Sequence, residues 1–287
     1  MDDAARLDAA LPDIDWSVLP PGAIASRFVA PSGEIAMISL GDPSHPRILM
    51  APGVTGSKED FILIMPALAE AGFHVQAVDI AGQYESGSAG PPPGARYTYT
   101  LFVDDMVALL EAGPTPAHLL GYSFAGTVAQ LVAVRRPDLV RSLTLLATPP
   151  DPGNGFARMK RVGWLARVAG ARVGAFFMVN GVKLNATKVD PGRHAFVRSR
   201  FALTSRRSVD DIIDLMMHAP DVEAELRELP IPKLVVVGIH DLWPVERSQA
   251  LAERIGARFA GYDTGHSPSE TAPHQLTRDL LELYAMA

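Results

Sequence analysis

The chain has 287 residues, of which 48% are apolar and 20% charged, and its formal net charge is −6. This composition is typical of a packed globular protein and argues against intrinsic disorder. The length predicts one large domain, or one domain with a sizeable insertion. An acidic balance without a Lys/Arg-rich stripe argues against a nucleic-acid partner.

The sequence contains no cysteine, which excludes thiolate nucleophiles, thiolate metal sites and disulfide bonds. The reducing cytoplasm fits this composition, and we expect a cytoplasmic protein. Residues 1–8 lack the basic segment and apolar core of a secretory signal. The most apolar long stretch, 162–182, contains Arg167 and Arg172, whose charges would be costly in lipid. We therefore expect no transmembrane span.

Short apolar runs typical of strands alternate with segments typical of helices. The runs that predict strands are 47–51, 74–80, 117–121, 142–147, 233–239 and 258–262. The segments that predict helices are 58–72, 99–112, 124–136, 244–255 and 273–284, with Pro66 indicating a kink or a late start in the first. Segments 26–29 and 34–40 predict an antiparallel hairpin at the sheet edge. The alternation predicts an α/β fold, with mostly parallel strands covered by helices on both faces.

The alternation stops after residues 148–150 and resumes at residue 233. Between these positions the sequence is helical in pattern, with Gly and Pro interruptions and no convincing strand. We predict that 1–148 and 231–287 form an α/β core and that 149–230 form a helical cap inserted into it. A segment of this size is typical of a functional lid rather than of a simple connection.

The motif Gly121-Tyr122-Ser123-Phe124-Ala125-Gly126 lies between a predicted strand and a predicted helix. A nucleophilic serine on a tight strand-to-helix turn has this context, with small neighbours that let the backbone fold sharply. The usual pattern is G-x-S-x-G, and here Ala125 replaces the last Gly. The alternative interpretation is that Ser123 only caps an ordinary helix.

Serine needs a base within hydrogen-bond reach, and His266 is the strongest of eight histidines. It follows the last predicted strand, so it lies at the carboxyl edge of the sheet, as does Ser123. His240 is the nearest rival. Asp241 ends the preceding strand and is the predicted carboxylate that orients the imidazole. The alternative interpretation is that Asp241 only caps the next helix. Asp151 is a second candidate for the carboxylate.

Acyl transfer also requires two backbone donors for an oxyanion. The N–H of Phe124, at a helix N-terminus, is the first candidate. The N–H of Val54, in a glycine-containing loop after the first parallel strand, is the second. This loop could instead be a plain strand-to-helix turn with Ser57 as the cap, and both interpretations can hold together.

A substrate pocket is expected beside these residues. Tyr122, Gly53 and Trp243 are its predicted lining, with Phe124 as a further wall. Apolar residues of the insertion could line an acyl pocket or, as is commoner, pack the cap onto the core: Trp164, Phe176, Phe177, Met178, Met216 and Met217. No dinucleotide fingerprint, phosphate loop or ligand cluster indicates a cofactor or a metal.

From about residue 26 to residue 284 the chain resembles the α/β-hydrolase superfamily, in its branch with a helical cap. Gly265-His266-Ser267-Pro268 resembles the family's G-H-x-P, and 79–86 resembles its D-x-x-G-x-G-x-S loop, with Tyr84 in place of a Gly. Pro52-Gly53 stands where many members have His-Gly. The resemblance implies an esterase-like hydrolase, and Ser123 argues against haloalkane dehalogenase and epoxide hydrolase chemistry, for which members use aspartate.

The sequence thus predicts a serine hydrolase of an apolar carboxylic ester, lactone or thioester that acts on a small molecule and forms an acyl-enzyme. A ligand-binding protein without hydrolytic activity is one alternative. A cofactor-free perhydrolase or haloperoxidase-type enzyme, which would use the same three residues, is another. A homo-oligomer is compatible with the sequence.

Overall fold

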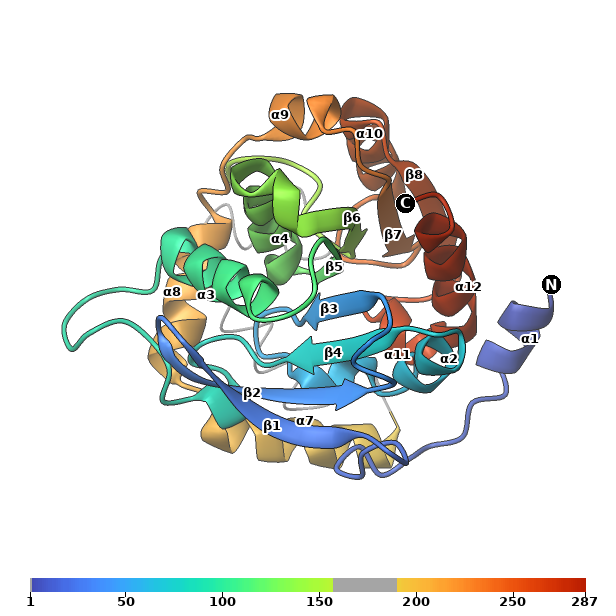
Figure 1. The fold of residues 1–287 in the computed structure, drawn as a ribbon, viewed down its shortest axis with the longest axis horizontal. Coiled ribbons are helices and arrows are strands. Elements are labelled where there is room, and N and C mark those ends of the chain that lie inside the picture. The colour runs from blue at the N-terminus through green and yellow to red at the C-terminus, as the bar shows by residue number, and fades with distance from the viewer. Residues whose placement is uncertain (1, 157–189) are drawn as a thin grey trace.

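The computed structural model describes residues 2–156 and 190–287. Its centre is an eight-stranded sheet in the order β1-β2-β4-β3-β5-β6-β7-β8 (Figure 1). Strands β3 to β8 run parallel to one another, while β2 is antiparallel to both β1 and β4. The strand bounds are β1 Ile24–Ala30, β2 Gly33–Leu40, β3 Arg47–Ala51, β4 His74–Val78, β5 Ala117–Tyr122, β6 Val140–Leu146, β7 Lys233–Gly238 and β8 Arg258–Tyr262.

Helices cover both faces of this sheet. One face carries α3 (Tyr99–Glu111), α4 (Phe124–Arg135), α9 (Glu223–Glu228) and α10 (Val245–Ile255) (Figure 1). The other carries α2 (Met65–Glu70), α11 (Pro268–Thr271) and α12 (Pro273–Tyr284), with α1 (Asp3–Asp8) packed on α12. Three short 3₁₀ helices complete these connections: η1 Lys58–Phe61, η2 Tyr84–Ser86 and η3 Pro137–Leu139.

The apolar core forms two clusters, one on each face of the sheet. Strand β3 shows the reason, because successive side chains of a strand point to opposite faces. Leu49 and Ala51 pack with α3 and α4, whereas Ile48 and Met50 pack with α2 and α12. All four are fully buried. The central parallel strands are therefore apolar on both faces, which is why they appear in the sequence as continuous apolar runs.

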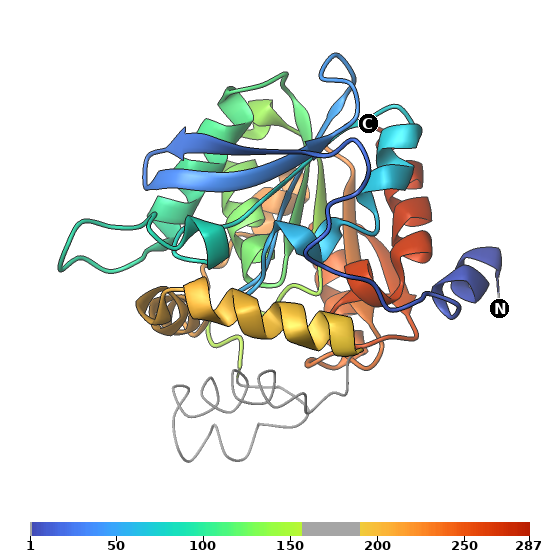
Figure 2. The ribbon, with the colours of Figure 1, turned by 90° about the horizontal axis from the view of Figure 1, so that it is seen from below.

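Two further helices lie at the carboxyl edge of the sheet. They are α7 (Pro191–Leu203) and α8 (Arg206–Met216), which precede α9 and β7 in the chain (Figure 2). Helix α7 contacts η2, in the loop after β4. Arg200 of α7 also donates to Asp60, in the segment after β3, and Ser208 of α8 accepts from Gln83, in the loop after β4. Both helices belong to the segment 149–230, whose assignment as a cap remains a prediction.

Most predicted elements are confirmed within two residues, including the antiparallel hairpin of β1 and β2. The single helix predicted for 58–72 is wrong. That segment folds as η1 followed by the separate helix α2, and Pro66 lies in the first turn of α2. Proline is tolerated there because its missing N–H would have no partner within the helix. The late start that Pro66 indicated is therefore confirmed.

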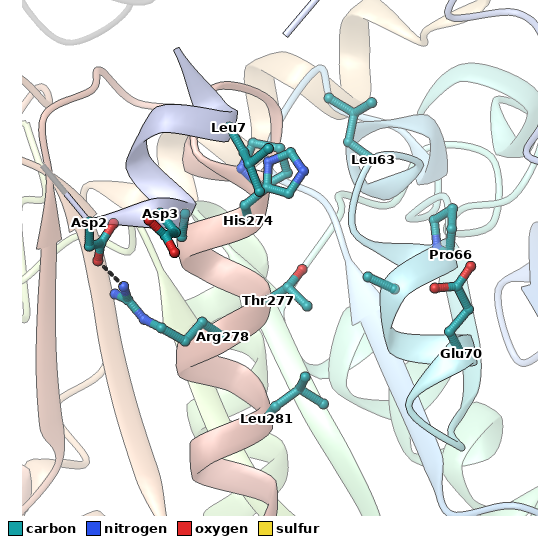
Figure 3. Close-up of a pocket in the computed structure, with 13 residues that line it drawn as sticks. Asp2, Asp3, Leu7, Leu63, Pro66, Glu70, His274, Thr277, Arg278 and Leu281 are labelled. Atoms are coloured by element: carbon teal, nitrogen blue, oxygen red, sulfur yellow. Dashed lines mark hydrogen bonds and ion pairs between the residues drawn. The ribbon is translucent and has the colours of Figure 1, made fainter. Parts of the chain in front are cut away.

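A groove of about 940 Å³ lies between α1, α2 and α12 (Figure 3). Leu7, Leu63 and Leu281 form its apolar wall, and Asp2 pairs with Arg278 at one end. No predicted site residue lines it. Across residues 2–156 and 190–287, no helix combines the length and apolar character needed to cross a membrane.

Candidate active site

Ser123 occupies a strained turn between β5 and α4. Its backbone has φ 52° and ψ −119°, a region that side-chain-bearing residues rarely adopt and that costs about 1–3 kcal/mol. The Ser123 N–H donates to the carbonyl of Leu146 in the neighbouring strand at 2.8 Å, which anchors the turn. The Ser123 side chain makes no capping hydrogen bond to α4. Its hydroxyl is therefore not used as a helix cap.

The side chains of Ser123, His266 and Asp241 form a continuous chain of hydrogen bonds. The Oγ of Ser123 lies 3.2 Å from Nε2 of His266, and Nδ1 of His266 lies 2.6 Å from Oδ1 of Asp241. Because a carboxylate only accepts, the Nδ1 nitrogen carries the hydrogen of a neutral imidazole. Nε2 is then left with a lone pair directed at the serine hydroxyl.

The surroundings of this chain favour a charged imidazole. The Asp241 side chain is 3% exposed and that of His266 is 27% exposed. Burial alone would lower the pKa of His266, but the Asp241 carboxylate outweighs it through its charge and its hydrogen bond, so the pKa is raised above 6.5. His266 can accordingly hold a proton that it takes from Ser123.

Two neighbouring strands bring Asp241 and His266 together. Asp241 lies in a turn after β7, where its N–H donates to the carbonyl of Gly238 at 3.0 Å. His266 lies in the turn after β8, which pairs with β7 in parallel. The N–H of His240 donates to the carbonyl of Thr264 at 3.0 Å and ties the two turns to each other. The carboxyl edge of the sheet thus positions both side chains.

The rival residues are engaged elsewhere. The Nε2 of His240 lies 2.8 Å from Oδ1 of Asp263, in a pair whose side chains are 67% and 86% exposed. Asp151 accepts two hydrogen bonds of 2.6 Å from the guanidinium of Arg247. Among the described residues, neither side chain forms a hydrogen bond with Ser123 or with the imidazole of His266.

Of the two predicted oxyanion donors, Phe124 directly follows Ser123 and Val54 follows Gly53, which packs against Ser123. A Cβ added to Gly53 would lie 2.8 Å from Cβ of Ser123, so this position requires glycine, and it brings the loop that holds Val54 against the serine. Phe124 directly follows Ser123 as the first residue of α4. Among the described residues, neither the Val54 N–H nor the Phe124 N–H has a hydrogen-bond acceptor. Both remain available to a ligand atom.

Tyr122 and Trp243 flank His266. Their rings lie 5.4 Å and 5.7 Å from the imidazole, and both residues are buried. The Tyr122 hydroxyl is 2.9 Å from Oγ of Ser267, and Trp243 donates to the carbonyl of Gly155 at 2.6 Å. These contacts hold the two rings against the imidazole.

The other predicted pocket residues differ in their surroundings. The Phe124 ring is fully buried against Tyr99 and Phe102 in the core. Met216 is also buried in the core, and Met217 packs against the same core cluster. Both are as expected for residues that attach helices to the sheet. Four predicted lining residues lie outside the described residues: Trp164, Phe176, Phe177 and Met178.

A buried network of charges beside the site was not predicted from the sequence. Oδ1 of Asp60 accepts from Arg193 at 2.7 Å and from Arg200 at 2.6 Å, both from α7. Arg193 also pairs with Glu270, in the short helix after His266. Burial alone would raise the pKa of Asp60, but the two guanidiniums lower it below its usual value. The network joins α7 to η1, which follows the loop that holds Val54, and to the short helix α11, which follows His266.

A second charged cluster surrounds Lys58. Its ammonium lies 2.8 Å from Glu59, 2.8 Å from Glu85 and 3.6 Å from Asp79. Burial raises the pKa of Asp79 to about 7 although Lys58 opposes the shift. Within residues 2–156 and 190–287, no group of three or more His, Asp or Glu side chains is arranged to hold a metal ion.

Comparison with known proteins identifies the family. A sequence model of the alpha/beta hydrolase fold matches residues 46–177. The chain is 31% identical over 219 residues to 2-hydroxymuconate semialdehyde hydrolase of Pseudomonas sp. (strain CF600), covering 71% of this chain and 72% of that protein. It therefore belongs to the α/β-hydrolase fold family.

Other matches are partial or distant. The chain is 33% identical over 127 residues to bifunctional epoxide hydrolase 2 of Rattus norvegicus, covering 44% of this chain. It spans only 22–24% of the length of this and two other mammalian epoxide hydrolases. The enol-lactonase of Burkholderia xenovorans LB400 superposes with a TM-score of 0.73 at 20% identity, covering 91% of this chain and 100% of that one. This likeness supports the fold.

Proposed function

We propose that the protein is a serine hydrolase that cleaves an apolar carboxylic ester, lactone or thioester through an acyl-enzyme. The observation that carries the proposal is the hydrogen-bonded chain of Ser123, His266 and Asp241 on a strained turn. A serine hydroxyl, a base and an orienting carboxylate are the three groups that nucleophilic acyl transfer needs.

The proposed reaction has two steps. Ser123 Oγ attacks the carbonyl carbon while Nε2 of His266, 3.2 Å away, takes the hydroxyl proton. The N–H groups of Val54 and Phe124 receive the oxyanion, and the imidazolium returns its proton to the leaving oxygen or sulfur. In the second step His266 takes a proton from a water molecule, whose oxygen attacks the acyl carbonyl carbon. The bond between that carbon and Ser123 Oγ then breaks, the imidazolium returns its proton to Oγ, and the carboxylic acid leaves.

The named activities of relatives support carbonyl substrates. They include 2-hydroxymuconate semialdehyde hydrolase and, at 33% identity over 135 residues, a pimeloyl-[acyl-carrier protein] methyl ester esterase of Neisseria meningitidis. Epoxide hydrolases also match part of the chain. Ser123 favours acyl transfer over epoxide opening, since the resemblance implies an aspartate at this position in that enzyme class.

We further propose that 149–230 form a cap over the site and select the substrate. Helices α7 and α8 support this, because they lie at the sheet edge where Ser123, His266 and Asp241 meet. Tyr122, beside the imidazole, and Gly53, beside the serine, would line the acyl side of the pocket together with Trp243.

Turnover of p-nitrophenyl esters of increasing acyl length tests the proposal, with Ser123→Ala and His266→Ala as matched controls. We expect hydrolysis by the native protein and a loss of about 10³-fold or more in kcat in each variant. An inactive native protein would favour a ligand-binding protein without hydrolytic activity. Peroxide-dependent formation of a peracid from a carboxylic acid, without ester turnover, would favour the perhydrolase alternative.

A further inference from the structure

Gln83 is a fully buried side chain that joins the loop after β3 to helix α8. Its Oε1 accepts a hydrogen bond of 2.8 Å from the backbone N–H of Thr55, in the loop after β3. Its Nε2 donates to Oγ of Ser208, in α8, at 2.7 Å. The side-chain amide of Gln83 therefore connects the loop that contains Val54 to helix α8.

The segment that Gln83 holds is a tight turn over 53–56. The Gly53 carbonyl accepts from the Gly56 N–H at 2.9 Å, and the third residue, Thr55, has φ 61°. A turn with positive φ at its third position is of type II and usually has Gly or Asn there. A β-branched threonine is disfavoured in this conformation. The turn therefore needs stabilisation from outside.

Gln83 supplies that stabilisation at the central peptide of the turn. The N–H of Thr55 belongs to the peptide that would have to rotate if Thr55 relaxed to a negative φ. Rotation would break the 2.8 Å bond and leave the buried Oε1 of Gln83 without a donor. Pro52, just before the turn, offers neither an N–H nor a polar side chain in place of Gln83.

Helix α8 and the residues just before it hold the loop that contains Gln83. A Cβ added to Gly82 would lie 2.4 Å from Cβ of Ser208, so only glycine permits this approach. The Gly82 carbonyl accepts from the Ser205 N–H at 2.9 Å, and the Tyr84 N–H donates to Thr204 at 3.1 Å. The position of α8 therefore fixes the Gln83 amide, and through it the turn.

We propose that Gln83 is a positioning residue, which holds the 53–56 turn so that the Val54 N–H faces the oxyanion, while Ser208 orients the Gln83 amide. This inference rests on the proposed function. Gln83 acts in the transition state through Val54, because it contacts the turn and not the substrate. Its removal lowers kcat more than it changes KM.

Kinetics of Gln83→Met and Gln83→Glu on a p-nitrophenyl ester test this role. Methionine keeps the length of the side chain but offers the Thr55 N–H only a weak sulfur acceptor. The kcat falls about 10- to 100-fold, less than the 10²–10³-fold loss of a whole oxyanion donor. Glutamate keeps an acceptor oxygen in either protonation state, and kcat stays within about threefold of the native value. KM changes by less than about threefold in both.

A rescue experiment separates positioning from general stability. Thr55→Gly in the Gln83→Met background recovers at least about fivefold in kcat, because glycine adopts positive φ without strain. A purely structural role would lower the thermal midpoint without this rescue. If Gln83→Met does not fold, Ser208→Ala replaces it and lowers kcat about 5- to 10-fold by freeing the Gln83 amide.

Two outcomes distinguish this inference from the proposed function. The role of Gln83 is overturned, and the serine mechanism is left intact, if Gln83→Met keeps the native kcat while Ser123→Ala is inactive. Where Ser208→Ala replaces Gln83→Met, the same result in that variant has the same meaning. An active Ser123→Ala overturns the proposed function itself. Failure of Thr55→Gly to restore activity to Gln83→Met also contradicts the role given to the turn.

Discussion

Replacing Ser123 by glycine should stabilise the protein while it abolishes turnover. Ser123 has φ 52° and ψ −119°, and relief of this strain contributes about 1–3 kcal/mol to the free energy of unfolding. Against this, glycine increases the conformational entropy of the unfolded chain, which offsets about 0.4–1 kcal/mol. Ser123→Gly should therefore gain about 0.5–2 kcal/mol. Ser123→Ala, which loses the hydroxyl but keeps a Cβ in the strained conformation, is the matched control.

Urea unfolding of the native protein and both variants measures this gain. Globular proteins unfold with an entropy of about 2.1 cal/mol/K per residue, so the gain corresponds to a rise of about 1–3 °C in the thermal midpoint. Both variants should be inactive, and only the glycine variant should be more stable. Equal stability of Ser123→Gly and Ser123→Ala would refute the claim that the turn stores strain.

Three further predictions concern charged groups. First, kcat/KM should rise with pH through a pKa above 6.5 that belongs to His266. Asp241→Asn should lower this pKa and should reduce kcat by about 10³–10⁴-fold. A pH profile of Asp241→Asn with the native pKa contradicts this. Second, Asp60→Asn removes the carboxylate that the buried guanidiniums of Arg193 and Arg200 share, and it should cost about 3 kcal/mol or more in urea unfolding; a loss below about 1 kcal/mol refutes it. Third, burial raises the pKa of Asp79 from 3.8 to about 7, so between these pH values the folded protein holds a proton that the unfolded chain releases. The free energy of unfolding should therefore decrease as the pH rises from 4 to 7, and this decrease should be smaller in Asp79→Asn.

The sequence predicted those parts of the fold that depend on local pattern. Parallel strands buried on both faces produce continuous apolar runs, as in β3 and β5, and these were placed almost to the residue. The helix predicted for 58–72 failed for a non-local reason. Lys58 looks like a solvent-facing helix position, but it is buried against Asp79 and Glu85, which lie far along the chain.

In the site, too, residues that follow a local pattern were predictable and residues held by long-range contacts were not. Ser123, Asp241 and His266 were predictable because each follows a recognisable strand, and parallel strands bring their carboxyl ends to one edge. Gln83 was not, because its bonds to Thr55 and Ser208 span 28 and 125 residues and leave no periodic or motif signal. Positive φ at Thr55 was equally hidden, since threonine does not normally indicate such a turn.

The most direct test of the account is the mass of the protein after reaction with a fluorophosphonate, followed by mapping of the modified peptide. The native protein should gain one phosphonyl group on Ser123, whose Oγ lies 3.2 Å from Nε2 of His266, the proposed base. The variant His266→Ala should react at least about 10²-fold more slowly. A native protein that gains no adduct, or gains it on another residue, would contradict the assignment of Ser123 as the nucleophile.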